Sequence, residues 1–151
     1  MTITGLEQLK ASVGKEAGVT DWYEITQEMI NRFADATGDH QWIHIDRERA
    51  ERESPFRTTV AHGFFTLSLL PMLVKQAVTV DINAKLSVNY GFNKLRFASP
   101  VPSNSRIRVR VTPSAVKELD GGVEIVWGIV VEVEGATKPA VVADWLGRLY
   151  F

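Results

Sequence analysis

Asp39 and His44 are the two side chains in this sequence best placed to do acid/base chemistry. They lie five positions apart in the segment from Thr37 to Asp46, just beyond a predicted helix end at Gly38. A carboxylate and an imidazole at this spacing can converge on one small molecule such as water. Taken alone, an Asp and a His in a loop more often cap a helix or bond to nearby backbone.

A second segment, from Val60 to Phe64, adds a group that could stabilise negative charge. Gly63 opens the most apolar predicted helix, where the first backbone N–H groups have no partner within the helix. A glycine lets a ligand approach the main chain closely, and such an N–H could hold a carbonyl oxygen whose charge grows during a reaction. We expect His62, beside it, to be a structural histidine at the helix entrance.

The first half of the chain, which must position these groups, has helical periodicity. Short helices are predicted at 3–13 and 46–53. Another helix is predicted from an N-cap at Thr26 to a stop at Gly38. The longest apolar pattern predicts a helix from Gly63 to Val78 that is apolar on most faces and therefore buried.

The second half alternates between polar and apolar residues, which is typical of half-buried strands. Asp120-Gly121-Gly122 is a turn signal. A change of parity between Phe92 and Leu95 predicts a β-bulge near 91–94. The order of elements indicates an α+β fold, a mainly antiparallel sheet with one buried helix against it. The predicted strands are 86–97, 106–111, 123–133 and 141–151.

Composition excludes several classes of function. The 151 residues are 45% apolar and 23% charged, with a net charge of -1, which favours one globular domain without a basic face for nucleic acid. The chain has no cysteine, so thiol chemistry and disulfides are excluded. Neither a signal peptide nor a membrane-spanning run is evident, and we expect a cytoplasmic protein.

The sequence resembles the MaoC-like (R)-specific enoyl-CoA hydratases, which have the hot-dog fold. Their signature reads roughly G-D-x-N-P-[aliphatic]-H-x5-[A/S], and Gln41 and Trp42 replace its Asn and Pro. The resemblance continues through Ala61-His62-Gly63 and the strand 89–97, and it covers roughly residues 22 to 151. The positions that match the signature are Gly38, Asp39, Ile43, His44 and Ala50.

The resemblance implies a single hot-dog domain over 1–151, a sheet wrapped around a central helix, that hydrates trans-2-enoyl-CoA to (3R)-hydroxyacyl-CoA. By the same resemblance, His44 is expected to take a proton from water, Asp39 to help hold that water and supply a proton to C2, and the Gly63 N–H to polarise the thioester carbonyl. No cofactor or metal is implied, and the expected partner is a second copy of the chain in a homodimer. The candidate substrate-binding residues are Trp42, Phe64, Asn93 and Lys94.

Three alternatives stay open at this point. Asp39, His40 and His44 could bind a metal, although no third nearby imidazole is assured. A hot-dog thioesterase would direct water at C1 with a carboxylate on the central helix, but no Asp or Glu lies between Phe64 and Val78. The chain could also be a non-catalytic subunit that binds acyl-CoA or pairs with an active partner.

Overall fold

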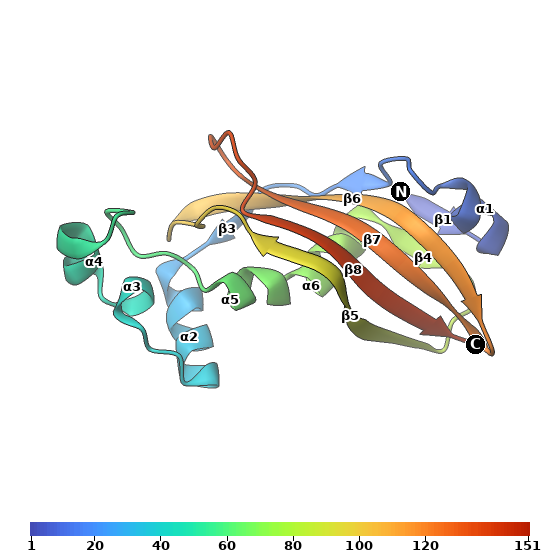
Figure 1. Cartoon of the computed structure of the whole chain (residues 1–151), viewed down its shortest axis with the longest axis horizontal. Helices are drawn as coiled ribbons and strands as arrows, with labels where there is room; N and C mark the ends of the chain where they lie inside the picture. The colour runs from blue at the N-terminus through green and yellow to red at the C-terminus, as the bar shows by residue number, and fades with distance from the viewer.

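The computed structural model describes all residues 1–151 and contains a long curved sheet that runs along most of the molecule (Figure 1). Its strand order is β2-β6-β7-β8-β5, with β3 also paired to β6, and all of these pairings are antiparallel. The predicted α+β class with a mainly antiparallel sheet is therefore confirmed. The strands are β2 (Gly18–Val19), β3 (Tyr23–Ile25), β5 (Leu86–Phe97), β6 (Ser105–Leu119), β7 (Gly122–Val133) and β8 (Val141–Tyr150).

The alternation in the sequence sets which face of the sheet is buried. In β7, and in β6 as far as Pro113, every second side chain is buried, and most of these side chains, such as Val109 and Ile129, belong to one core of 25 residues. The β6–β7 hairpin turns at Asp120-Gly121, where Gly121 has a φ of 69° that a glycine adopts without strain. The side chains of the other parity, including Val126 and Val130, are only half-buried.

Local capping explains the helices that precede the candidate catalytic residues. In α2 (Gln27–Thr37), Thr26 accepts a hydrogen bond from the Met29 N–H, and Gly38 ends the helix with a left-handed φ of 78°. Asp46 caps α4 (Arg47–Glu53) by accepting from the Arg49 N–H. The short α3 (Trp42–Ile45) fills the gap between them.

The central helix is broken, in contrast to the continuous helix predicted from 63 to 78. It consists of α5 (Gly63–Ser68) and α6 (Leu70–Ala77), which meet at Leu69. Pro71 lies in the first turn of α6, where its missing N–H costs nothing, whereas inside one continuous helix it would remove a hydrogen bond. Burial is also incomplete, since Phe64 is 67% exposed and Met72 39% exposed. None of the helices has both the length and the apolarity that crossing a membrane requires.

The N-terminal segment also differs from the predicted helix over 3–13. Residues Thr2–Thr4 form the strand β1, parallel to β4 (Thr79–Asp81), and the helix α1 covers only Leu6–Ala11. The side chain of Ile3 is completely buried in the core. Pairing with a strand far away in the sequence therefore overrides the local helical pattern.

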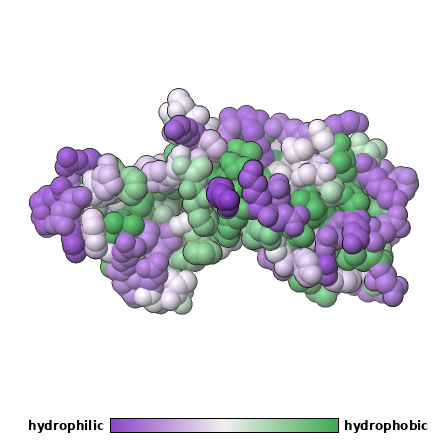
Figure 2. Space-filling model, in the orientation of Figure 1, coloured by the Kyte–Doolittle hydropathy of each residue, from purple (hydrophilic) through white to green (hydrophobic).

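Strand β5 forms an edge of the sheet and is irregular. Its register with β8 shifts twice, between Asn89 and Gly91 and between Phe92 and Lys94, so the strand has two irregularities where the sequence indicated one. Most of its side chains are exposed, and Figure 2 shows hydrophobic residues in green in the middle of the molecule, with hydrophilic residues in purple among them. The exposed apolar side chains of β5 are Leu86, Val88, Tyr90, Phe92 and Phe97.

Candidate active site

The candidate active site lies between α2, α3 and the start of α5, at one end of the sheet (Figure 1). The left-handed turn at Gly38 ends α2 and directs the chain into Asp39, and α3 then carries His44. The extended segment 59–62 leads into α5 and places His62 and Gly63 beside them. These four residues are separated by up to 24 positions in the sequence, and local helix ends bring them together.

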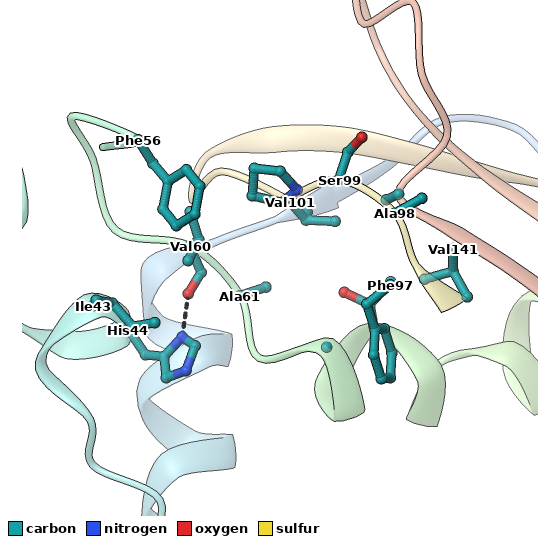
Figure 3. Close-up of a pocket in the computed structure, with 14 residues that line it drawn as sticks. Ile43, His44, Phe56, Val60, Ala61, Phe97, Ala98, Ser99, Val101 and Val141 are labelled. Carbon is teal, nitrogen blue, oxygen red and sulfur yellow. Dashed lines mark hydrogen bonds between the residues drawn. The ribbon is translucent and has the colours of Figure 1, made fainter. Parts of the chain in front are cut away.

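His44 is buried, with 7% of its surface exposed, and its ring is fixed by one hydrogen bond. Its Nδ1 lies 2.7 Å from the main-chain oxygen of Val60, a contact drawn in Figure 3. Because a carbonyl oxygen only accepts, Nδ1 carries the proton and Nε2 keeps its lone pair. Burial lowers the pKa of His44, and the neighbouring His62 lowers it further. The imidazole is thus held in the neutral form that a general base needs.

The backbone around His44 is tied to three other elements. The Gln27 side chain donates to the His44 main-chain oxygen at 2.7 Å, and it accepts from the buried hydroxyl of Thr59. The Val60 N–H donates to Ile43 O at 3.0 Å. The oxygen that orients the His44 ring is therefore itself fixed in place, as a precise acid/base group requires.

Asp39 is more exposed than His44 and less constrained. Its side chain is 55% exposed, and Oδ1 accepts from the Gln41 N–H at 3.3 Å. Its other oxygen, Oδ2, lies 4.0 Å from Nε2 of His62. The carboxylate is thus reachable by solvent beside the buried imidazole of His44.

His62 connects the two predicted catalytic residues, a contact that local sequence patterns did not reveal. Its ring stacks on that of His44, with the ring centres 3.8 Å apart and the planes at 24°. Its Nε2 lies 3.0 Å from the main-chain oxygen of Asp39. We predicted a structural histidine that bonds backbone at the helix entrance, and this hydrogen bond is of that kind.

Gly63 is the first residue of α5 and has no room for a side chain. A Cβ built on it would lie 2.9 Å from the ring of Phe97 on β5. Figure 3 shows the Phe97 ring against the start of α5, and Phe97 also packs edge-on against Phe64, with ring centres 5.6 Å apart. The absence of a side chain therefore lets β5 pack closely on the main chain at this point.

A cavity of about 310 Å³ opens beside His44 and Gly63. Its wall is mainly apolar, and Thr66 adds a hydroxyl from the next turn of α5. Such a cavity suits an apolar group next to a few polar ones. Sequence patterns around the motif did not indicate that Phe56 and the segment that follows β5 line this cavity. The lining residues labelled in Figure 3 are Ile43, His44, Phe56, Val60, Ala61, Phe97, Ala98, Ser99, Val101 and Val141.

The four predicted substrate-binding residues lie outside this cavity lining. Trp42 is half-buried, and the guanidinium of Arg49 on α4 lies 4.3 Å from the centre of its ring. Phe64 is largely exposed, and Asn93 and Lys94 lie on the exposed edge strand β5. Of the predicted catalytic residues, His44 and Gly63 lie in the cavity wall, and Asp39 lies beside His44 without lining the cavity.

The groups that could bind a metal differ from the predicted trio. His40 is exposed and turns away to Asp35, at 2.9 Å, and this hydrogen bond raises the pKa of His40. Ligand atoms of Asp39, His44 and His62 do lie within 4.8 Å of one another. However, nearly parallel stacked rings direct their in-plane lone pairs alongside each other, whereas a metal needs them to converge. The arrangement suits proton transfer better than metal binding.

Comparison with known proteins relates this geometry to a family. A family model described as "MaoC like domain" matches residues 8–134. A relative from Mycobacterium tuberculosis, named 3-hydroxyacyl-thioester dehydratase Z, is 51% identical over 148 residues and covers 97% of both chains.

Solved structures share the fold at lower identity. The monoamine oxidase regulatory protein from Archaeoglobus fulgius has a TM-score of 0.79 at 16% identity, covering 99% of this chain and 98% of its own. An unliganded (R)-hydratase from Pseudomonas aeruginosa has a TM-score of 0.67 at 21% identity, covering 91% and 81%. The ChsH1-ChsH2 complex from M. tuberculosis includes a chain with a TM-score of 0.67 at 17% identity, covering 92% and 100%. The predicted hot-dog fold is confirmed.

Proposed function

Because this chain belongs to the MaoC-like dehydratase family of hot-dog proteins, we propose that it hydrates trans-2-enoyl-CoA to (3R)-hydroxyacyl-CoA, and catalyses the reverse dehydration, in fatty-acid metabolism. The observation that carries the proposal is the state of His44, a buried neutral imidazole with a free Nε2, one of whose ring nitrogens lies within 4.8 Å of an oxygen of the Asp39 carboxyl group. The cavity next to it is apolar enough for an acyl group. The name of the M. tuberculosis relative, which specifies a 3-hydroxyacyl thioester, supports this substrate class.

The proposed reaction uses one water molecule. Asp39 helps to hold the water while Nε2 of His44 takes one of its protons and the oxygen adds to C3. The Asp39 carboxyl group gives its proton to C2 and becomes a carboxylate, and transfer to this carboxylate of the proton that His44 took from water restores both groups. The Gly63 N–H donates to the thioester oxygen, whose negative charge grows as the C3–O bond forms. The acid, the base and the oxyanion donor thus act on three different atoms of the reacting system.

Crotonyl-CoA tests the proposal directly. We expect the absorbance of its conjugated thioester to fall without release of free thiol, and chiral analysis of the product to give the (3R) form. Thiol release would instead indicate the thioesterase, the rival function in which water attacks C1. No change in absorbance at high protein concentration would leave a non-catalytic acyl-CoA-binding subunit.

We further propose that the chain works as a homodimer that covers the exposed edge strand β5. An unpaired edge with apolar side chains is a surface that other chains can cover. A groove of about 570 Å³ between α6 and β5, with Trp127 and Trp145 in its wall, lies beside this edge. The ChsH1-ChsH2 complex makes a heteromeric partner the alternative outcome of the test.

A further inference from the structure

His62 is the buried ionisable residue that the proposed reaction leaves without a role. Only 3% of its surface is exposed, and its ring is enclosed by Phe33 of α2, at 5.0 Å between ring centres, and by His44 of α3. The charged or titratable groups that face it are His44 and the Asp39 carboxylate, the latter 4.0 Å away. Its Nδ1 is the one buried side-chain nitrogen or oxygen without a hydrogen-bond partner.

The hydrogen-bond partners assign the protons on both stacked rings. His62 Nε2 lies 3.0 Å from the main-chain oxygen of Asp39, so Nε2 carries the proton and the unpartnered Nδ1 has the lone pair. His44 has the opposite arrangement, with its proton on Nδ1 and its lone pair on Nε2. Because the two rings lie 3.8 Å apart, the neighbouring His62 opposes a positive charge on His44 and contributes to its lowered pKa.

We propose that His62 is a positioning residue of this active site, which holds Asp39 by its main-chain oxygen while its ring supports the face of His44. The inference rests on the proposed hydratase function. Within the short loop between α2 and α3, the Asp39 side chain is held by one long contact, at 3.3 Å from the Gln41 N–H. The bond from His62 fixes the main chain of Asp39 to the start of α5, next to the donor Gly63. His62 thus sets the distance between the acid and the oxyanion donor.

Two substitutions separate the hydrogen bond from the aromatic stack. His62→Gln retains an N–H donor near the position of Nε2, whereas His62→Phe retains a ring and loses the donor. Because the hydrogen bond is the positioning contact, we expect His62→Gln to keep kcat within about threefold of wild type and His62→Phe to lower kcat tenfold or more. KM for crotonyl-CoA should change less than kcat in both. His40→Gln, at an exposed histidine of the same segment, is the matched control and should leave both parameters unchanged.

A measurement without turnover keeps the test independent of the proposed function. The chain has three histidines, so 15N spectra of the wild type and of variants at residues 40, 44 and 62 assign each ring nitrogen. We expect the proton of neutral His62 on Nε2. A proton on Nδ1 overturns the proposal, and so does a folded His62→Phe protein with the kcat of wild type or of His62→Gln. If His62→Phe does not fold, the position of the proton on His62 in the wild-type protein decides whether the proposal stands. A wild type without hydratase activity but with His62 protonated on Nε2 contradicts the proposed reaction and leaves the positioning contact standing.

Discussion

The surroundings of Asp39 and His44 match the roles of acid and base proposed for them. His44 is buried and bonded through Nδ1 to a carbonyl that other hydrogen bonds fix, whereas Asp39 is exposed at a helix end. A base benefits from a fixed lone pair in a dry site, and an acid beside that base can regain its proton from it after each reaction. The two side chains therefore meet the different needs of one reaction.

Removing either group should nearly abolish hydration. We expect Asp39→Asn and His44→Gln each to lower kcat for crotonyl-CoA by about a hundredfold or more, a typical effect of losing an acid/base group. The double variant should lose little beyond the worse single variant, since both groups act on one water molecule. Circular dichroism confirms folding. Near-normal turnover in either folded single variant removes that residue from the mechanism.

The lowered pKa of His44 sets the pH dependence of activity. Since the reaction needs neutral His44, the acid limb of kcat/KM should lie below about pH 6.5, the ordinary value for histidine. A profile between pH 4.5 and 8 measures this limb. An acid limb above pH 6.5 would contradict the assignment of His44 as the base.

Stability should depend on the same group. The folded state resists protonation of His44, so the unfolded state binds more protons between the lowered folded pKa and about pH 6.5. His44 therefore costs stability as the pH falls through about 6.5. Between pH 7.5 and pH 5.5, the melting temperature of the wild type should therefore fall further than that of His44→Gln. Equal falls in the two proteins count against a lowered pKa.

At the scale of elements, the contact between β5 and α5 determines what residue 63 can be. We expect Gly63→Ala to cost about 1–3 kcal/mol of unfolding free energy, because its methyl group overlaps the Phe97 ring. In a Phe97→Ala background the same change should cost less than about 1 kcal/mol. Urea denaturation of the four proteins in this double-mutant cycle gives the coupling. An equal cost in both backgrounds excludes a steric effect of Phe97.

Trp42 tests whether the junction of α3 and α4 shapes substrate choice. Its ring packs on Arg49 and does not line the cavity, so Trp42→Ala should leave the ratio of kcat/KM for crotonyl-CoA and a ten-carbon enoyl-CoA within about twofold of wild type. The melting temperature should fall, since the variant loses a large, half-buried ring and its contact with Arg49. Phe56→Ala is the matched control because Phe56 lines the cavity, and it should change the ratio. A shifted ratio for Trp42→Ala would restore the substrate-binding role predicted from sequence.

Local signals in the sequence were sufficient for the elements that end near the site. Thr26, Gly38 and Asp46 act on the neighbouring backbone, so the bounds of α2 and α4 could be predicted from them. The stacking of His62 on His44 and the packing of the Phe97 ring against Gly63 depend on how segments distant in the sequence pack together. Those contacts have no local pattern, which is why the sequence indicated that Asp39 and His44 lie close together but not which residues form the cavity wall.

At the scale of the whole molecule, the large hydrophobic side chains that are exposed on strands all belong to β5. The proposed homodimer should have twice the 16.8 kDa mass of the chain in sedimentation at micromolar concentration. Leu86→Glu together with Val88→Lys should give a folded monomer, because both side chains are exposed in the single chain and only a partner would bury them. Val13→Lys, at an exposed apolar residue of another segment, is the control, and this variant should remain a dimer. A monomeric wild type overturns the proposal.

The parallel pair of β1 and β4 has a consequence for the order in which the protein acquires its structure. During synthesis β1 is made before Asp39, His44, His62 and Gly63, and β4 is made after all four, so Ile3 cannot reach its buried position until the intervening chain exists. The entropy cost of closing this loop is only slightly larger than that of a shorter loop. The pairing of β1 with β4 is nevertheless non-local and therefore slow to form. When refolding is followed by pulse-labelled hydrogen exchange, the backbone amides of β1 should therefore become protected after those of the β6–β7 hairpin.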